Sequence, residues 1–564
     1  MTTSERARSE APDVAAALDM LLAEAAVGIS RRFRPARSLA TLGRQVAARP
    51  GLAAREGIAL ARQLGQIAAG RSELAPEPRD RRFADAAWTT NPFLRRVVQA
   101  YLAAAGAGTR FVDRLELDPL ARERVRFVVS SLVDASAPSN NPLLNPAALK
   151  ELVDSGGASV VRGVRAFADD MAARPRVPRM VEHDAFEVGR DLAITPGSVV
   201  HRDELYELIQ FAPQTAHVHA TPLLIVPPTI NKYYILDLAP GRSLIEFLVQ
   251  QGHQVFAISW RNPDARFRDR GLDASGAAVV DALGAVRRIA GSRAANLMGV
   301  CSGGIIASMV MAHLSAAGDR QVDAFTLLVT VLDQAPVGIT RTLIDDATVT
   351  AAMNASAKQG YLDGNALAEV FAWLRPNDLI WNYWVNNYLL GRKPPAFDIL
   401  YWNSDTTRMP ARMHHDFLGI ATANALVTPN APTMMGTPVD LGKVDADTYM
   451  VAGVGDHICP WQSCYRSTQL LGGSSRFVLS TSGHIAALVN PPDNPKASYQ
   501  VGDRPGPDAE TWARDTERQS GSWWEDYSSW LAARSGPRKR APRSTGGRGF
   551  APREPAPGTY VFDR

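Results

Sequence analysis

Six short apolar segments between residues 222 and 479 constrain the fold of this chain more than any other feature. Each is continuously apolar, is flanked by turn residues and alternates with stretches of helical character. Strands of this kind are typical of a parallel sheet that is buried on both faces, and strands that alternate with helices predict a doubly wound α/β domain. The segments are 222–226, 255–258, 296–300, 325–329, 449–452 and 476–479.

A sharp turn after the third segment provides a candidate nucleophile. The strand sequence Asn-Leu-Met-Gly-Val is followed by Cys301, Ser302 and Gly303 and then by an apolar helical stretch. Gly-x-Ser-x-Gly between a strand and a helix is the nucleophile elbow of α/β-hydrolases, and here cysteine stands in place of serine. The helix N-terminus lowers the pKa of a thiol. We therefore predict an α/β-hydrolase fold with Cys301 as nucleophile and the backbone N–H of Ser302 as the first oxyanion donor.

This fold places an acid and then a histidine downstream of the nucleophile. Asp456 follows the fifth apolar segment and His484 follows the sixth, so both belong to loops at the carboxyl edge of the sheet. We predict that Asp456 is the acid and His484 the base. The alternatives are that Asp456 only forms a turn and that His484 only hydrogen-bonds within its loop. His457 is a rival base, and Asp405 and Asp264 are weaker candidates for the acid.

The loop that follows the first apolar segment, residues 227–232, is expected to supply the second oxyanion donor. The backbone N–H of Ile230 is our candidate, although the same residues could simply form a rigid Pro-Pro turn. Three further residues, Trp402, Asp264 and Asn231, are candidates for the substrate pocket. Trp402 would form a wall of an acyl pocket, or else pack as an ordinary core residue.

The three cysteines, Cys301, Cys459 and Cys464, do not make a disulfide framework and indicate a reducing compartment. We interpret Cys459 and Cys464 as small buried residues, because no further Cys or His cluster accompanies them to complete a zinc shell. No metal is therefore expected. The formal net charge of +4 gives no argument for nucleic-acid binding. The polar first residues and the lack of a long apolar run predict neither a signal peptide nor a transmembrane segment.

Residues 1–195 are rich in Ala and Arg and are predicted to form a mainly helical N-terminal domain. Near its start, apolar residues recur at helical spacing. Such a helix either packs on its own core or presents an amphipathic surface to a partner or a hydrophobic particle. These residues are Val14, Leu18, Leu21, Leu22 and Ala25.

The catalytic domain is expected to span residues 196–564 and to contain an insertion. Residues of about 337–435 interrupt the strand–helix alternation and are dense in aromatic residues and Asn. They would form a lid, or cap, over the strand ends, or else a plain helical core segment. The Pro-, Gly- and Arg-rich tail from about residue 535 is expected to be flexible and solvated.

Segments along nearly the whole chain resemble polyhydroxyalkanoate (PHA) synthases, and most closely the single-subunit, medium-chain-length class. The first 75 residues resemble the family only loosely. The matching segments are 80–83, Trp88, 91–92, 137–140, 145–146, 227–232, 259–263, 299–304, 375–384, 455–458 and 483–485.

The resemblance implies a reaction, a set of site residues and partners. It makes Cys301 the nucleophile, His484 the base and Asp456 the acid of an enzyme that polymerises (R)-3-hydroxyacyl-CoA into polyester. CoA would be part of the substrate and a released product, so no separate cofactor is implied. The resemblance also implies a homodimer in the cytoplasm that associates with polyester granules and with granule-associated proteins, the phasins, through the helical N-terminal domain.

The cysteine itself favours transfer over hydrolysis. Exchange of an acyl group between CoA and Cys301 is nearly thermoneutral, and the acyl-enzyme stays an activated thioester, which a hydroxyl can convert into a more stable ester. The closest alternative is a cysteine-type hydrolase, either an esterase or a polymer depolymerase. A non-catalytic granule-surface protein that keeps an inactive hydrolase fold is the alternative from another class.

Overall fold

The computed structural model describes residues 22, 25–26, 35–78, 80–117, 119–172, 174–335 and 346–564. They form two compact units. The sheet unit comprises the described residues of Met1–Ala26 with His183–Gly364 and Phe397–Arg564, and the helical unit comprises those of Val27–Glu182 with Asn365–Ala396. The boundary between the units thus lies at 182/183, whereas the boundary predicted from the sequence was near residue 195. Residues 365–396, expected to belong to a cap on the catalytic domain, group with the helical unit.

A ten-stranded sheet forms the centre of the sheet unit. Six neighbouring strands, β5 to β13 in the order given below, are parallel. They coincide with the six apolar segments, so the predicted mostly parallel sheet is confirmed. In spatial order the strands are β1 (Gly197–Arg202), β2 (Tyr206–Phe211), β5 (Val255–Trp260), β4 (Leu223–Val226), β6 (Ala295–Val300), β7 (Val322–Leu328), β12 (Asp447–Gly453), β13 (Ser475–Ser480), β14 (Ser498–Asp503) and β15 (Arg518–Ser520).

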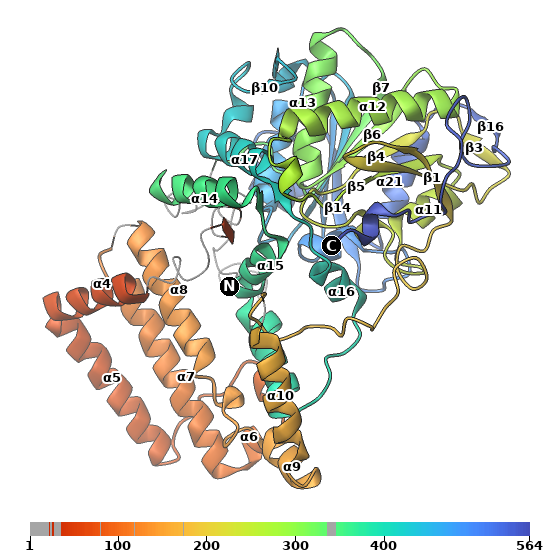
Figure 1. Ribbon diagram of the computed structural model, residues 1–564. Helices are drawn as coiled ribbons and strands as arrows, with labels where there is room; N and C mark the ends of the chain where they lie inside the picture. The colour runs from red at the N-terminus through yellow and green to blue at the C-terminus, as the bar shows by residue number, and fades with distance from the viewer. Residues whose placement is uncertain are drawn as a thin grey trace. The chain divides into compact units, whose positions relative to one another are not determined.

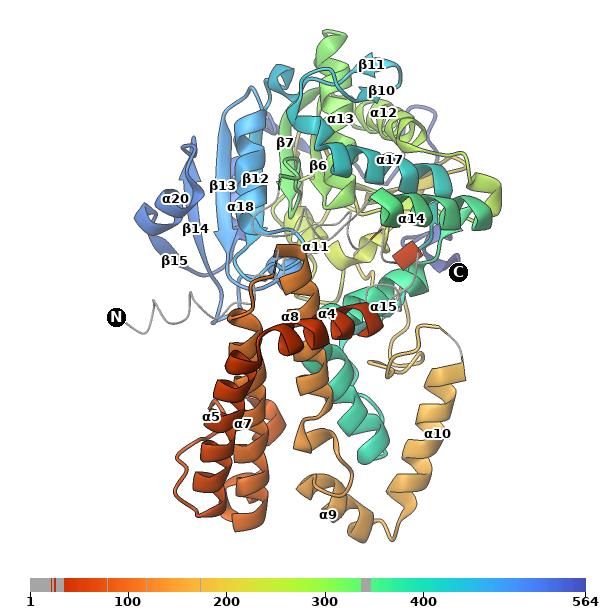
Figure 2. The same ribbon diagram turned by 90° about the vertical axis from the view of Figure 1, so that its left-hand side faces the viewer.

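Two antiparallel pairs, which the sequence analysis did not predict, extend the parallel core at its edges. At one edge β1 pairs with β2, which in turn pairs antiparallel with β5. At the other edge β14 pairs with β13, and β15 follows (Figure 2). β15 is exposed along its whole length. The edge strands β1 and β15 carry polar and charged residues. The inner strand β2 is buried but includes Glu207 and Gln210, so it too lacks a continuous apolar character.

Helices pack against this sheet and carry the connections between its strands. α12 (Leu272–Ala290) and α13 (Ser302–Ala316) lie side by side and contact β4 and β6 (Figure 1). α13 is buried on nearly all sides, which agrees with its apolar sequence. α11 (Leu244–Gln250) and α21 (Trp523–Ala532) meet through the rings of Phe247 and Trp524, whose centroids are 5.6 Å apart.

The remaining elements of the sheet unit are short or belong to its connections. They are β3 (His217–His219), η3 (Tyr233–Leu236), η4 (Ala265–Phe267), α14 (Asp346–Gln359), β8 (Tyr361–Leu362), α16 (Asp398–Ser404), β9 (Met409–Pro410), α17 (Ala411–Ala423), η8 (Ala425–Val427), β10 (Thr433–Met434), β11 (Thr437–Pro438), η9 (Leu441–Lys443), α18 (Trp461–Ser467), η10 (Thr468–Leu470), α19 (His484–Leu488), α20 (Ala509–Asp515), β16 (Arg538–Arg540) and η11 (Tyr560–Phe562).

The tail from residue 535 is docked on the sheet unit, so the expectation of a flexible, solvated tail is wrong. β16 pairs antiparallel with β3. Farther on, the backbone N–H groups of Thr559 and Tyr560 donate to the buried carboxylate of Glu207, at 2.9 and 3.0 Å. Tyr560 and Val561 are themselves buried. Composition misled here because contacts with the folded domain, rather than a core within the tail, order these residues.

The helical unit confirms the mainly helical character predicted for the N-terminal region. α5 packs along α7 (Figure 2), and α7 packs against α8. Its elements are α4 (Pro35–Ala48), α5 (Pro50–Ala68), η1 (Arg81–Phe83), α6 (Ala87–Thr90), α7 (Pro92–Asp113), α8 (Pro119–Ala135), η2 (Pro138–Asn140), α9 (Pro146–Asp154), α10 (Ala158–Ala172), α15 (Gly364–Leu374) and the π-helical turns η6 (Asn377–Trp381) and η7 (Trp384–Leu389).

Residues near the N-terminus are described only in part. Of the five apolar positions at helical spacing, Val14, Leu18 and Leu21 lie outside the described residues, and Leu22 and Ala25 are buried in the sheet unit. Across the described part of the chain, no helix combines the length and the apolar character that a bilayer crossing requires.

Two Asn-Pro pairs among the family-like segments begin helices. The side chain of Asn91 accepts hydrogen bonds from the backbone N–H groups of Phe93 and Leu94, at 2.9 and 3.2 Å, and Pro92 is the first residue of α7. Asn145 caps α9 in the same way. Asn is among the preferred N-cap residues, and Pro suits the first helical position because its missing N–H would have no partner there.

Aromatic residues of the predicted insertion form part of the core of the helical unit. Phe167 of α10 contacts the rings of Trp384 and Tyr388, both of η7, edge to face. The indole N–H of Trp384 donates to the carbonyl of Asn140 at 3.1 Å. Tyr401 and Trp402, in contrast, belong to the sheet unit. The aromatic insertion is therefore divided between the two units.

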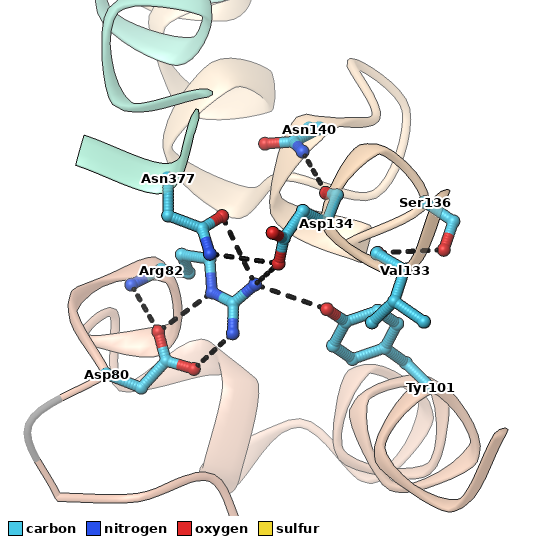
Figure 3. Close-up of polar contacts among 8 residues, drawn as sticks. All are labelled: Asp80, Arg82, Tyr101, Val133, Asp134, Ser136, Asn140 and Asn377. Atoms are coloured by element: carbon cyan, nitrogen blue, oxygen red, sulfur yellow. Dashed lines mark hydrogen bonds and ion pairs between the residues drawn. The ribbon is translucent and has the colours of Figure 1, made fainter. Parts of the chain in front are cut away.

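A guanidinium group joins three segments of the helical unit that are distant in sequence. Arg82 makes a two-pronged ion pair with Asp80, at 3.0 and 2.9 Å, and also reaches Asp134 of α8 at 3.3 Å (Figure 3). Asn377 donates to the same Asp134 oxygen at 2.9 Å, and the hydroxyl of Tyr101 accepts from Arg82 at 3.2 Å. The ion pairs raise the pKa of Arg82 despite its burial. The network ties η1, α8 and η6 together.

Replacement of Arg82 by Ala is expected to destabilise the helical unit by about 1.5–3 kcal/mol, because it leaves the partly buried Asp134 carboxylate without its cation. Urea denaturation of the full chain measures this change. Arg81→Ala is the matched control, because Arg81 is adjacent and exposed. Equal unfolding midpoints for the two variants would contradict a structural role of the network.

Candidate active site

Cys301 lies in a tight turn between β6 and α13, as the sequence predicts. Its φ is 51° and its ψ −120°, a combination that is strained for any residue with a Cβ. The neighbouring glycines are required by packing. A Cβ on Gly303 would lie 2.4 Å from the carbonyl oxygen of Pro227, and a Cβ on Gly299 would lie 2.6 Å from the Cα of Gly304. The elbow thus fits closely against the loop after β4.

Asp456 and His484 form a hydrogen-bonded pair at the same edge of the sheet. His484 Nδ1 lies 2.7 Å from Asp456 Oδ2. The other carboxylate oxygen accepts the backbone N–H groups of Ile458 and Cys459, both at 2.8 Å. Asp456 therefore forms an Asx-type turn and orients the histidine at once, so the two interpretations of this residue were not exclusive.

The Asp456–His484 pair lies close to the sulfur of Cys301, as expected for residues that follow strands at the same edge of the sheet. The ligand atoms of Cys301, Cys459 and His484 all lie within 4.8 Å of one another. They come from the ends of β6, β12 and β13, which belong to the parallel part of the sheet. All three side chains are buried; Cys301 is 4% and His484 8% exposed.

The electrostatics favour charge separation between sulfur and imidazole. Hydrogen bonds from the thiol of Cys459, from His484 and from the backbone of Ser302 lower the pKa of Cys301 to about 5, against the opposing effect of burial. Burial by itself would lower the pKa of His484, but the charge and hydrogen bond of Asp456 outweigh it and raise that pKa to about 10. The directions agree with a thiolate beside an imidazolium.

The proposed oxyanion donors lie at the elbow and on the loop after β4. The hydroxyl of Ser302 holds this loop, since its oxygen accepts the backbone N–H of Thr229 at 3.0 Å. Ile230, the next residue, is buried, and its carbonyl accepts from the backbone N–H of Thr407 at 3.4 Å. The Pro227–Thr229 region is thereby fixed beside the nucleophile, which is where a second donor is needed. The role of the Ile230 N–H itself stays a prediction.

Two of the three predicted pocket residues, Trp402 and Asn231, join the loop after β4 to the region of α16, and the third has a local contact on the surface. Trp402 is buried and donates its indole N–H to the carbonyl of Lys232 at 2.7 Å. Asn231 forms a backbone bridge with Thr406. Asp264 begins η4 and pairs with Arg266 at 2.8 Å on the surface. None of these contacts joins the pocket candidates to Cys301 or His484.

The rival acid and base are positioned less favourably than the predicted pair. Asp405 accepts the hydroxyl of Tyr234 at 2.9 Å. His457 is half-buried and next to the acid in sequence, while His484 holds the hydrogen bond to Asp456. The geometry therefore brings together Cys301, His484 and Asp456.

Cys459 was interpreted from the sequence as a small buried residue, and that interpretation is incomplete. Its thiol is buried and also lies beside the nucleophile. One signal could have revealed this. Cys459 follows Asp456 by three residues in one loop, and that loop must return toward the elbow if Asp456 is to orient the base.

Fold and geometry define the class of the protein: an α/β-hydrolase-fold protein with a Cys–His–Asp arrangement at the carboxyl edge of its sheet. A family profile described as the poly-beta-hydroxybutyrate polymerase (PhaC) N-terminus matches residues 79–248, and an alpha/beta hydrolase fold profile matches residues 222–491.

Whole-chain similarity narrows this class to one family. Identity is 48% over 529 residues to poly(3-hydroxyalkanoate) polymerase 2 of Ectopseudomonas oleovorans, covering 93% of this chain and 94% of that protein. It is 41% over 539 residues to the polymerase subunit PhaC of Cupriavidus necator, covering 91% and 90%. This chain belongs to the poly(3-hydroxyalkanoate) polymerase family, as its resemblance to PHA synthases implied, and it is an acyltransferase-type enzyme.

The lowered pKa of Cys301 predicts the pH dependence of its alkylation. The thiolate is the reactive form, so labelling by iodoacetamide should persist at neutral pH and decline only as the pH falls toward about 5. Asp456→Asn removes the charge that stabilises the imidazolium, and it should move the midpoint upward, toward the range of a free thiol. Mass spectrometry of the labelled peptide distinguishes Cys301 from Cys459 and Cys464. A midpoint near 8.5 in the unaltered enzyme would contradict the ion pair.

Proposed function

We propose that Cys301, His484 and Asp456 carry out the polymerisation of (R)-3-hydroxyacyl-CoA, with the growing polyester bound to Cys301 as a thioester. The observation that carries the proposal is the imidazole of His484, which Asp456 fixes at 2.7 Å and which lies within 4.8 Å of the sulfur. Family membership indicates that the product is a polyester. The geometry of the site provides a nucleophile, a base and the group that orients the base.

Acylation follows directly from the charge distribution. The Cys301 thiolate attacks the thioester carbonyl, and the backbone N–H groups of Ser302 and Ile230 stabilise the oxyanion. The intermediate collapses, the bond to the CoA sulfur breaks, and His484 donates its proton to the departing CoA thiolate. One thioester is exchanged for another, and His484 ends the step as a neutral base.

Elongation uses that neutral base. His484 takes the proton of a hydroxyl from another monomer or chain, and the resulting alkoxide attacks the acyl group on Cys301. The sulfur leaves as a thiolate beside the imidazolium, so the starting charge state is restored. An ester replaces a thioester in this step, which therefore runs downhill. Asp456 stabilises the imidazolium and holds it in one orientation throughout.

Burial of the site supports transfer to a hydroxyl over transfer to water. Cys301 and His484 are almost inaccessible, and water that reached the acyl-enzyme would end the chain by hydrolysis. Admission of an acyl chain then requires segments near the strand ends to move, as in other lidded enzymes. The parts of the predicted insertion that belong to the sheet unit, residues 346–364 and 397–435, are our candidate for the moving part. The hydrolase alternative is weaker, because this chain matches polymerases over most of its own length and of theirs.

Replacement of Cys301 by Ala is expected to lower the rate of CoA release and of polymer formation by at least about 10⁴-fold, the usual size of a nucleophile deletion. Cys301→Ser should retain little activity, because the acyl group would be bound as an oxygen ester without driving force for transfer. Cys464→Ala, which removes another buried thiol, is the matched control. Polymer synthesis by Cys301→Ala would rule out the assignment, whereas free hydroxy acid as the product of the unaltered enzyme would favour the hydrolase.

Medium-chain monomers are the substrate class that we propose, on the basis of the resemblance described above. Incorporation of monomers from CoA thioesters of four to ten carbons, measured with the unaltered enzyme, distinguishes this preference from a short-chain or mixed preference. Highest incorporation of the four-carbon unit would contradict it.

We further propose that the enzyme works as a homodimer at the granule surface, where phasins also bind, and that the helical unit makes the granule contact. Exposed apolar side chains support this role: Val153 of α9 and Val161 and Val164 of α10 are 78%, 66% and 63% exposed. Exposed apolar side chains of this kind can bind hydrophobic surfaces.

Replacement of Val161 and Val164 together by Lys should lower the granule-bound fraction of the enzyme several-fold, because each ammonium would have to lose its hydration at the polymer surface. Sedimentation of polymer granules with added enzyme measures that fraction. Sedimentation velocity of the free enzyme separately measures whether it is a dimer. Ala54→Lys with Ala61→Lys adds the same charge at exposed positions of α5 and serves as control. Equal losses in both double variants would attribute the effect to charge alone.

A further inference from the structure

Three soft metal-ligand groups converge at the nucleophile, and the polymerisation scheme uses only two of them. These groups are the thiols of Cys301 and Cys459 and the imidazole of His484, which we call the Cys–Cys–His cluster. The ligand atoms of the three residues all lie within 4.8 Å of one another. All three side chains are buried. In the acyl-transfer steps above, Cys459 neither binds the acyl group nor transfers a proton.

The spacing of the cluster suits a small tetrahedral ion. Zn²⁺ binds thiolate sulfur at about 2.3 Å and imidazole nitrogen at about 2.0–2.1 Å. Two ligands at those distances and at tetrahedral angles are about 3.5–3.8 Å apart. The ligand atoms of the cluster, all within 4.8 Å, need to approach by only about an ångström, which side-chain rotation supplies. Two thiolates and an imidazole also match the ligand preference of Zn²⁺ over harder cations.

The orientation of His484 is that of a metal-binding histidine. Its Nδ1 is engaged by Asp456 at 2.7 Å, which leaves Nε2 for the sulfur side of the ring. Metal-binding histidines commonly hold a carboxylate on the other ring nitrogen, and this partner fixes the ring and makes the bound nitrogen more basic. Asp456 is itself anchored by the backbone N–H groups of Ile458 and Cys459. The loop that orients the base therefore also brings in the second thiol.

We propose that the Cys–Cys–His cluster is a binding site for Zn²⁺, and that an ion bound there blocks acyl transfer by occupying the nucleophile and the base. Cys301, Cys459 and His484 would be the ligands, with water at the fourth position. The ion is an inhibitor in this proposal, not a cofactor. Binding of Zn²⁺ stands on the geometry alone, whereas inhibition rests on the proposed function of Cys301 and His484.

Co²⁺ provides a direct spectroscopic test of binding that needs no activity. Titration of the full-length enzyme, kept reduced with a phosphine, should produce the visible bands of tetrahedral Co²⁺ together with sulfur-to-metal charge transfer, and Zn²⁺ should abolish both by displacement. Cys459→Ala should weaken Zn²⁺ binding by more than about 100-fold, which exceeds the loss typical of an outer-sphere partner. Asp456→Asn should weaken it by about 10–100-fold.

Cys464→Ala is the matched control for these variants. Cys464 is equally buried and follows Cys459 by five residues, but its thiol is directed to the carbonyl of Cys459, at 3.7 Å, and it is outside the cluster. This variant should bind Zn²⁺ as the unaltered enzyme does. Wild-type Zn²⁺ affinity in Cys459→Ala, or octahedral Co²⁺ spectra in the unaltered enzyme, would overturn the proposal.

The activity measurement separates the two parts of the inference. CoA release should fall as Zn²⁺ fills the site, should return on addition of a chelator, and should require more than about 100-fold more Zn²⁺ for half-inhibition in Cys459→Ala, in parallel with the binding constant. Tetrahedral binding without inhibition would leave the metal site standing and would count against Cys301 as nucleophile. Inhibition that is equal in all variants would place the inhibitory ion elsewhere and overturn the proposed site.

Discussion

The close fit between the elbow and the loop after β4 is the constraint on which the rest of the site depends. At Gly303, a Cβ atom would lie only 2.4 Å from the carbonyl oxygen of Pro227, so a side chain does not fit there. Cys301, two residues earlier, has a strained backbone conformation, with a φ of 51°. The hydroxyl of Ser302, the residue after Cys301, accepts the backbone N–H of Thr229 and so holds the loop of Thr229 and Ile230 beside the elbow. Packing around the elbow thus fixes both Cys301 and the loop for which we propose the second oxyanion donor.

The carboxylate of Asp456 has a comparable effect on the other half of the site. One of its oxygens orders the loop after β12 through two backbone N–H groups, and the other orients His484. Because loop order and ring orientation share one side chain, the position of Cys459 is coupled to the position of the base. The thiol of Cys459 lowers the pKa of Cys301, and it is the third ligand of the Zn²⁺ site that we propose.

Several family-like segments have structural explanations that need no role in chemistry. Asn91 and Asn145 cap helices, and Arg82 joins η1 to Asp134 and η6. The motif around residue 80 and the motif around residue 377 are thus two halves of one polar network within the helical unit. Their residues stabilise the architecture of that unit, whereas the residues that we propose for the reaction lie at strand ends of the sheet unit.

The sequence by itself determined the parallel core and the elbow, and it predicted the strand ends after which Cys301, Asp456 and His484 lie. These features follow from local patterns, since apolar runs mark buried strands, and a turn with glycines at fixed offsets marks the elbow. Only the tertiary structure decided the place of Cys459, the docking of the tail on β3 and Glu207, and the division of the aromatic insertion between the two units. Each of these depends on contacts between residues far apart in sequence, and composition or periodicity carries no information about which distant surfaces meet.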